Sequence, residues 1–81
     1  MPLDRPLPSP LALVINGSRH IIGSLREAAW LLADAWPDPG CAGLRTALAA
    51  CAAALEGRLS VDEARAIIRS VAEGSGIAVE G

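Results

Sequence analysis

Residues Cys51–Arg65 read CAAALEGRLSVDEAR, and this stretch decides the fold of the chain. It contains the end of an alanine-rich helix at Gly57, where glycine readily adopts the left-handed conformation that closes a helix. A new helix begins at Ser60, because Ser60 and Glu63 have the S-x-x-E spacing of a capping box. The stretch therefore predicts two consecutive helices joined by a tight turn.

The two helices around this turn extend over residues 41–56 and 60–73, and their apolar residues recur at helical spacing. The predicted buried stripes are Leu44, Leu48, Cys51 and Leu55 in the first helix, and Ala64, Ile67, Ile68, Val71 and Ala72 in the second. The opposite side of the first helix is mostly Ala42, Thr46, Ala49, Ala50 and Ala53. Such a small-residue side lets another helix approach closely, or it reflects high helix propensity alone.

Before these helices, residues 11–15 and 20–23 have the pattern of the two strands of a β-hairpin. Asn16-Gly17 between them favours a tight turn, since both residues tolerate positive φ. Both faces of the first strand are apolar, so the pattern leaves its register open. A further helix then begins at Ser24, again with the S-x-x-E spacing, and is ended by Pro37, which cannot continue a helix.

The two ends of the chain complete the predicted architecture. Residues 77–80 alternate like a short strand, which we expect to pair with the hairpin. Prolines at positions 2, 6, 8 and 10 make residues 1–10 a flexible proline-rich arm. We therefore predict a single α+β domain over residues 11–81: an N-terminal β-hairpin, three helices and a short C-terminal strand that completes a small antiparallel sheet.

The composition argues against two classes of partner. The net charge argues against nucleic acid, and the length of the apolar runs argues against a membrane. A net charge of −2 and a pI near 5.2 do not suit a polyanion partner. The apolar runs are too short for a membrane span and the N-terminus has no signal-peptide pattern, so we expect a cytoplasmic bacterial protein. Trp30 and Trp36 are the only aromatic residues, and a core this small favours pairing with a second copy, a possible homodimer.

Several short motifs together resemble one family of small bacterial proteins, Domain of Unknown Function 982. They are the Ser24 capping box, Ala28-Ala29, Leu32, Trp36-Pro37, Cys51, Ala54-Leu55, Gly57, Ala64-Arg65 and Gly76-Ile77-Ala78-Val79. The resemblance covers about residues 11–80. Where the family often has an aromatic residue after the Ala-Arg pair, this chain has Ile67 and Ile68. The resemblance implies no established activity, so it transfers no catalytic residue.

Three residues are candidates for binding a small molecule or an anion, or for a minor enzyme activity. His20 is the only histidine, and a general base or metal ligand would need partners close to it. Cys41 lies at a helix start, where the backbone N–H groups lower a thiol pKa. Arg65 suits a carboxylate ligand, or else a salt bridge between helices. Cys51 lies on a core stripe and is expected to be inert.

Trp30 is the residue whose position is hardest to explain by folding alone. Helical geometry places it beside Arg26 and Asp34 on the side that faces water. It serves an interface, or it lies flat over Arg26 or under the proline arm. We therefore predict a non-enzymatic module that self-associates or binds an unknown protein partner through Trp30, Arg26 and Asp34. We assign no catalytic residue, and we expect no cofactor and no metal site.

Overall fold

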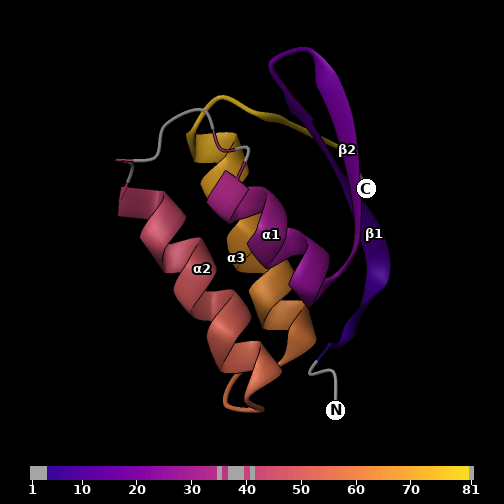
Figure 1. Ribbon diagram of the computed structural model, residues 1–81, viewed down its shortest axis with the longest axis vertical. Helices are drawn as coiled ribbons and strands as arrows, with labels where there is room; N and C mark the ends of the chain where they lie inside the picture. Colours follow the sequence, from indigo (N-terminus) through magenta and orange to yellow (C-terminus); the bar gives the residue numbers. More distant parts are fainter. Residues whose placement is uncertain (1–3, 35, 37–39, 41, 81) are drawn as a thin grey trace.

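The hairpin and the C-terminal segment form one three-stranded antiparallel sheet in the computed structural model, which describes residues 4–34, 36, 40 and 42–80. The strands are β1 (Pro6–Ile15), β2 (Ser18–Ser24) and β3 (Ala78–Glu80), in the spatial order β2-β1-β3. The helices are α1 (Leu25–Asp34), α2 (Ala42–Leu55) and α3 (Val61–Gly74). All three lie on one side of the sheet, with α2 outermost (Figure 1). The predicted α+β architecture is confirmed.

The register of the hairpin is fixed by its turn. Asn16 has a φ of 52° and Gly17 a φ of 79°, so the predicted two-residue turn forms. Leu13 then lies opposite His20, and Ala12 lies opposite Ile21. Because successive side chains of a strand point to opposite faces, His20 is on the helix side of the sheet and Ile21 is on the outer side.

Strand β1 begins at Pro6, whereas the sequence predicts a strand from Leu11. The described part of the proline-rich segment contacts the rest of the domain. Leu7 is buried in the core, and the N–H of Leu25 donates to the Arg5 carbonyl at 2.9 Å. Prolines suit this position because β3 pairs only with residues 12–14, so the part of β1 before them is an open edge where a missing N–H is tolerated.

The N-terminus of α1 is capped from two directions. The Ser24 hydroxyl accepts a hydrogen bond from the N–H of Glu27 at 3.2 Å, as predicted. Asp4 adds a second cap, since its Oδ1 accepts from the N–H of Arg26 at 3.0 Å. Desolvation of Asp4 raises the pKa of its carboxyl. Hydrogen bonds from the Arg26 N–H, the Ser24 hydroxyl and the Arg5 N–H, together with the charge of Arg26, have the opposite effect. These interactions outweigh desolvation, so the pKa of Asp4 lies below its ordinary value.

The turn between α2 and α3 forms as the sequence predicts. Gly57 has a φ of 83°, and the N–H of Arg58 donates to the Ala53 carbonyl at 2.8 Å, which closes α2. Ser60 accepts from the N–H of Glu63 at 3.1 Å, and its hydroxyl donates to the Glu63 carboxylate at 3.0 Å. These contacts turn the chain back on itself, so that α2 and α3 pack side by side (Figure 1).

The buried side of α2 differs from the predicted stripe. Its buried residues are Leu44, Ala47, Ala50, Cys51 and Ala54, whereas the predicted core residues Leu48 and Leu55 are only partly buried. The prediction was wrong for Ala50, which was placed on the opposite side. The reason is that α2 packs against both α1 and α3, and alanines allow both helices to approach it closely while the leucines lie at the margins.

Candidate functional site

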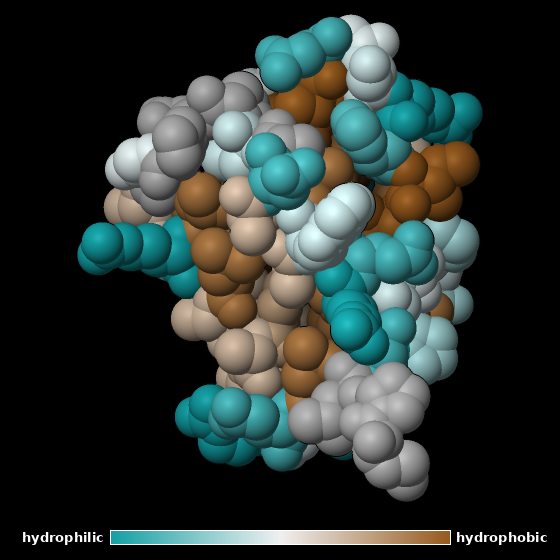
Figure 2. All heavy atoms as spheres, in the orientation of Figure 1, coloured by the Kyte–Doolittle hydropathy of each residue, from teal (hydrophilic) through white to brown (hydrophobic). Residues whose placement is uncertain are grey.

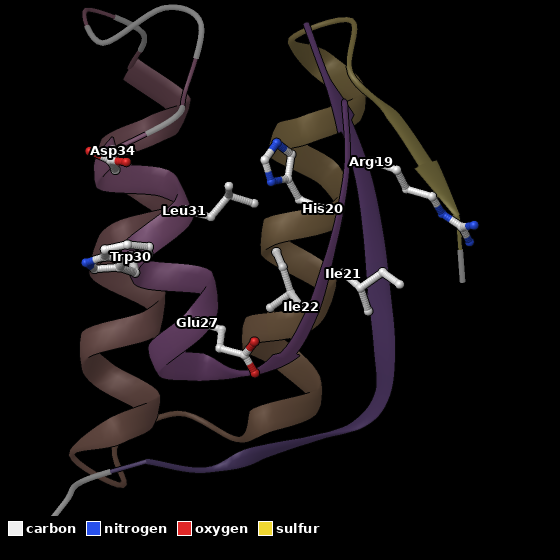
Figure 3. Close-up of a pocket in the computed structure, with 8 residues that line it drawn as sticks. All are labelled: Arg19, His20, Ile21, Ile22, Glu27, Trp30, Leu31 and Asp34. Carbon is white, nitrogen blue, oxygen red and sulfur yellow. The ribbon is translucent and has the colours of Figure 1, made fainter. Parts of the chain in front are cut away.

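A surface groove of about 390 Å³ lies between α1 and β2. It is lined by Arg19, His20, Ile21 and Ile22 from β2 and by Glu27, Trp30, Leu31 and Asp34 from α1. Figure 3 shows His20 and Ile22 directed toward the helix, while Arg19 and Ile21 point to the other side of the sheet. The groove therefore runs along the edge of β2, where residues from both faces of the strand can reach it.

The local sequence explains why this groove exists. The chain turns at Ser24, where the strand ends and the capped helix begins, so α1 runs back alongside β2. The buried residues Leu25, Ala28 and Leu32 hold one side of α1 against the core. The opposite side of the helix, which carries Trp30, is left facing solvent.

Two large hydrophobic side chains are exposed beside the groove. Trp30 is 75% exposed and Ile21 is 62% exposed, and no other large hydrophobic residue in the described part of the chain is exposed to this degree. The exposure of Trp30 agrees with its predicted position, and the described part of the proline-rich segment, residues 4–10, does not cover it. Exposed apolar side chains of this size mark interaction surfaces when they occur together.

The backbone of β2 offers hydrogen-bonding groups along this groove. In an antiparallel pair joined by a two-residue turn, alternate residues bond to the partner strand, beginning with the pair that flanks the turn. That pair is Ile15 and Ser18, so Ser18, His20 and Ile22 bond to β1. Arg19 and Ile21 therefore direct their N–H and carbonyl groups away from β1, toward the open edge.

His20, a candidate from sequence, lies in the groove but has no chemical partner there. It is half-buried, and within the described ranges its imidazole makes no hydrogen bond to another residue. Among the described residues, there is no cluster of three or more His, Cys, Asp or Glu residues that could hold a metal ion. Proton transfer by His20 would need an orienting partner or a substrate that supplies one.

Arg65 is positioned elsewhere, by contacts with the first strand. Its Nε donates to the Ser9 carbonyl at 3.0 Å and its Nη2 to the Pro10 carbonyl at 3.5 Å. Arg65 is not one of the residues that line the groove, so the structure does not bring it together with His20. The guanidinium instead ties α3 to the proline-rich part of β1.

Only one of the two cysteines, Cys51, lies in the described part of the chain. Cys41 lies outside the described residues. Cys51 is a free, buried cysteine, and burial raises the pKa of its thiol to about 11. A thiol with so high a pKa is almost entirely protonated at neutral pH and is a poor nucleophile, as the sequence predicts.

Sequence reasoning missed part of this site. Helical geometry placed Trp30 and Asp34 on one exposed side and His20 was a candidate, but Ile21 and Leu31 were not identified. For Ile21 the available signal was the hairpin turn, because Asn16-Gly17 pairs Ile21 with Ala12 and so places it on the face opposite to that of Leu13. The strand pattern could not decide it, since both faces of the hairpin carry apolar residues.

Comparison with known proteins identifies the family but no activity. Residues 9–79 match the family model described as "Protein of unknown function (DUF982)". The match covers nearly the whole chain, so the chain belongs to this family, as its motifs predicted. Searches of curated proteins and of solved structures returned no significant match. In the described residues, no helix has the length and apolar character needed to cross a membrane.

Proposed function

We propose that this member of the DUF982 family is a non-enzymatic protein-interaction module. Its binding surface, which we call the α1–β2 surface, consists of the groove-lining residues and the neighbouring Arg26. The single observation that carries the proposal is the exposure of Trp30 and Ile21 on either side of an open strand edge. Exposed aromatic and aliphatic side chains surrounded by charged residues are typical of the centre and rim of a protein interface.

The open edge of β2 adds a second means of binding. A strand from a partner can pair with the outward-facing backbone groups of Arg19 and Ile21 and extend the sheet. Backbone pairing supplies affinity, while the side chains beside the edge supply specificity. His20 and Trp30 lie where they would contact the side chains of such a strand on the helix side.

The alternative function, a small-molecule or anion site or a minor enzyme using His20, Cys41 or Arg65, has less support. Catalysis and anion binding both need several groups that converge on one ligand. Of the two candidates in the described residues, only His20 lines the groove, while Arg65 donates to backbone carbonyls of β1. The groove carboxylates Glu27 and Asp34 would also repel an anion, and the one arginine of the groove, Arg19, pairs with Glu80.

Site-specific photo-crosslinking in the organism that produces the protein tests this proposal. A photoreactive amino acid is placed at Ile21 or Asp34, which lie on the α1–β2 surface, and at Ala49 or Ala66, which are exposed on α2 and α3. We expect defined protein adducts from Ile21 and Asp34 and none above background from Ala49 and Ala66. Equal, weak labelling at all four positions would refute a binding role for this surface.

A further inference from the structure

We infer that the occupant of the α1–β2 surface is a second copy of this chain, paired antiparallel along β2 about a two-fold axis that passes beside Ile21 and Trp30. This inference rests on the proposed function and specifies its partner. The two three-stranded sheets would join into one continuous sheet, with α1 of each copy facing α1 of the other across the axis. Four features of the molecule lead to this arrangement.

First, β2 is an edge strand without the usual protection. Natural edge strands are shortened, interrupted by proline or guarded by charged side chains. The other edge strand, β3, covers only Ala78–Glu80, while β2 spans Ser18–Ser24 and contains no proline. Its one charged residue, Arg19, pairs with Glu80 at 2.9 Å on the outer face of the sheet, so its side chain is drawn back over β1 and away from the edge.

Second, Ile21 and Trp30 lie at the same level. The chain reverses at Ser24, from which Ile21 is three residues back along the strand and Trp30 is six residues on along the helix. At about 3.3 Å per strand residue and 1.5 Å per helix residue, both are roughly 9 to 10 Å from the turn. One two-fold axis can therefore place Ile21 opposite Ile21 of the second copy on the outer face and Trp30 opposite Trp30 of the second copy on the helix side.

Third, the charges on α1 are symmetric about Trp30 and opposite in sign. Arg26 precedes Trp30 by four residues and Asp34 follows it by four, so all three share the exposed side of the helix. Figure 2 shows this face, with hydrophilic and pale residues along α1 and apolar surface to either side. When two such helices meet antiparallel at Trp30, each Arg26 lies opposite Asp34 of the other copy.

Fourth, this order of charges does not stabilise α1 within a single copy. A cation in the first turn and an anion in the last turn both oppose the helix macrodipole, and Arg26 and Asp34 occupy those positions. Arg26 lies near Asp4, but Asp34 makes no ion pair with any described residue. Association of two copies supplies the counter-charge that Asp34 lacks.

The first test measures association by sedimentation equilibrium for the wild type, Arg26→Asp, Asp34→Arg and the double variant. Each single reversal replaces two attractions in the dimer with two repulsions, so we expect a Kd about tenfold weaker. The double variant should return to within about threefold of the wild type. Positions 26 and 34 are two helical turns apart in one chain, so only contacts between copies can produce this restoration.

The second test traps the strand pairing with a disulfide in a Cys41→Ser background, where Cys51 remains buried. Residues directly opposite in an antiparallel pair have Cα atoms about 5.5 Å apart, within disulfide range. Ile21→Cys should therefore form a covalent dimer on mild oxidation. Ala78→Cys, which is also exposed on the outer side of the sheet, is the matched control and should remain monomeric.

The outcomes separate this inference from the proposed function. Trapping at position 21 together with rescue by the double variant supports the two-fold dimer. A wild type that is monomeric at all concentrations overturns it. A dimer whose Kd is unchanged by the charge reversals and that Ile21→Cys does not trap overturns it as well. If the photo-crosslinks at Ile21 and Asp34 join a different protein and never a second copy, the interaction role stands and the dimer is refuted.

Discussion

Replacing Arg65 with methionine tests whether this arginine serves the fold or a ligand. Methionine keeps an unbranched apolar side chain against α3 and β1 but removes the guanidinium, which donates to the Ser9 carbonyl at 3.0 Å and the Pro10 carbonyl at 3.5 Å. These contacts join α3 to the proline-rich part of β1, where the sheet has no third strand. The substitution should therefore reduce the free energy of unfolding.

The expected loss follows from the geometry. A hydrogen bond from a charged donor contributes about 1.5 to 3 kcal/mol when it is well shielded. Arg65 is only half-buried, and the contact with Pro10 is at the long limit for a hydrogen bond, so most of the effect comes from Ser9. We estimate a loss of about 1 to 2 kcal/mol, which lowers the urea midpoint by roughly 1 to 2 M at the usual slope for a domain of this size.

Urea unfolding followed by far-ultraviolet circular dichroism measures this loss, with Arg69→Met as the matched control. Arg69 lies one turn further along α3, with Glu73 at 3.9 Å, and such an exposed pair contributes only about 0.3 to 0.5 kcal/mol. If Arg65→Met were no more destabilising than Arg69→Met, the structural role assigned to Arg65 would be refuted, and a ligand role would regain support.

Three further predictions concern the caps and the buried thiol. Ser60→Ala removes the acceptor for the N–H of Glu63 and should cost about 1 kcal/mol in urea unfolding; no change would contradict the capping role. Because the folded pKa of Asp4 is lowered, the charge of Asp4 stabilises the fold above its unfolded pKa, and this contribution is lost as the pH falls through the folded value. Asp4→Asn should therefore lower the melting temperature at pH 7 but not near pH 2, and an equal effect at both would contradict the contact with Arg26. In a variant with Cys51 as the sole cysteine, a thiol reagent at pH 8 should react only when the protein unfolds, because Cys51 is buried and its thiol pKa is raised to about 11; rapid labelling would show that the site is open.

Local signals in the sequence predicted most of the architecture. The turn at Asn16-Gly17, the caps at Ser24 and Ser60 and the glycine stop at Gly57 each depend on residues within a few positions of one another. Such features are short-range, so the residues that form them are adjacent in the sequence. They are the features that the structure confirms.

Features that depend on distant contacts could not be predicted in the same way. Asp4 caps α1, and Arg65 contacts Ser9 and Pro10, across long separations in the sequence that no local pattern encodes. The rotation of α2 that buries Ala50 arises because that helix packs between two others, which a single-helix pattern does not describe. The same limit applies to the groove. Helical geometry was enough to predict that Trp30 is exposed, but the exposure of its neighbour Ile21 could be predicted only from the register of the hairpin.

Hydrogen exchange at the backbone amide of Ile21, measured by NMR over a range of protein concentrations, tests the central claim most directly. In the monomer this amide faces the open edge of β2, whereas in the two-fold dimer it donates a hydrogen bond to β2 of the second copy. We predict that its protection rises with concentration in parallel with the measured mass, while the amide of His20, which faces β1, is protected throughout. Exchange at Ile21 that stays fast and independent of concentration would contradict the account.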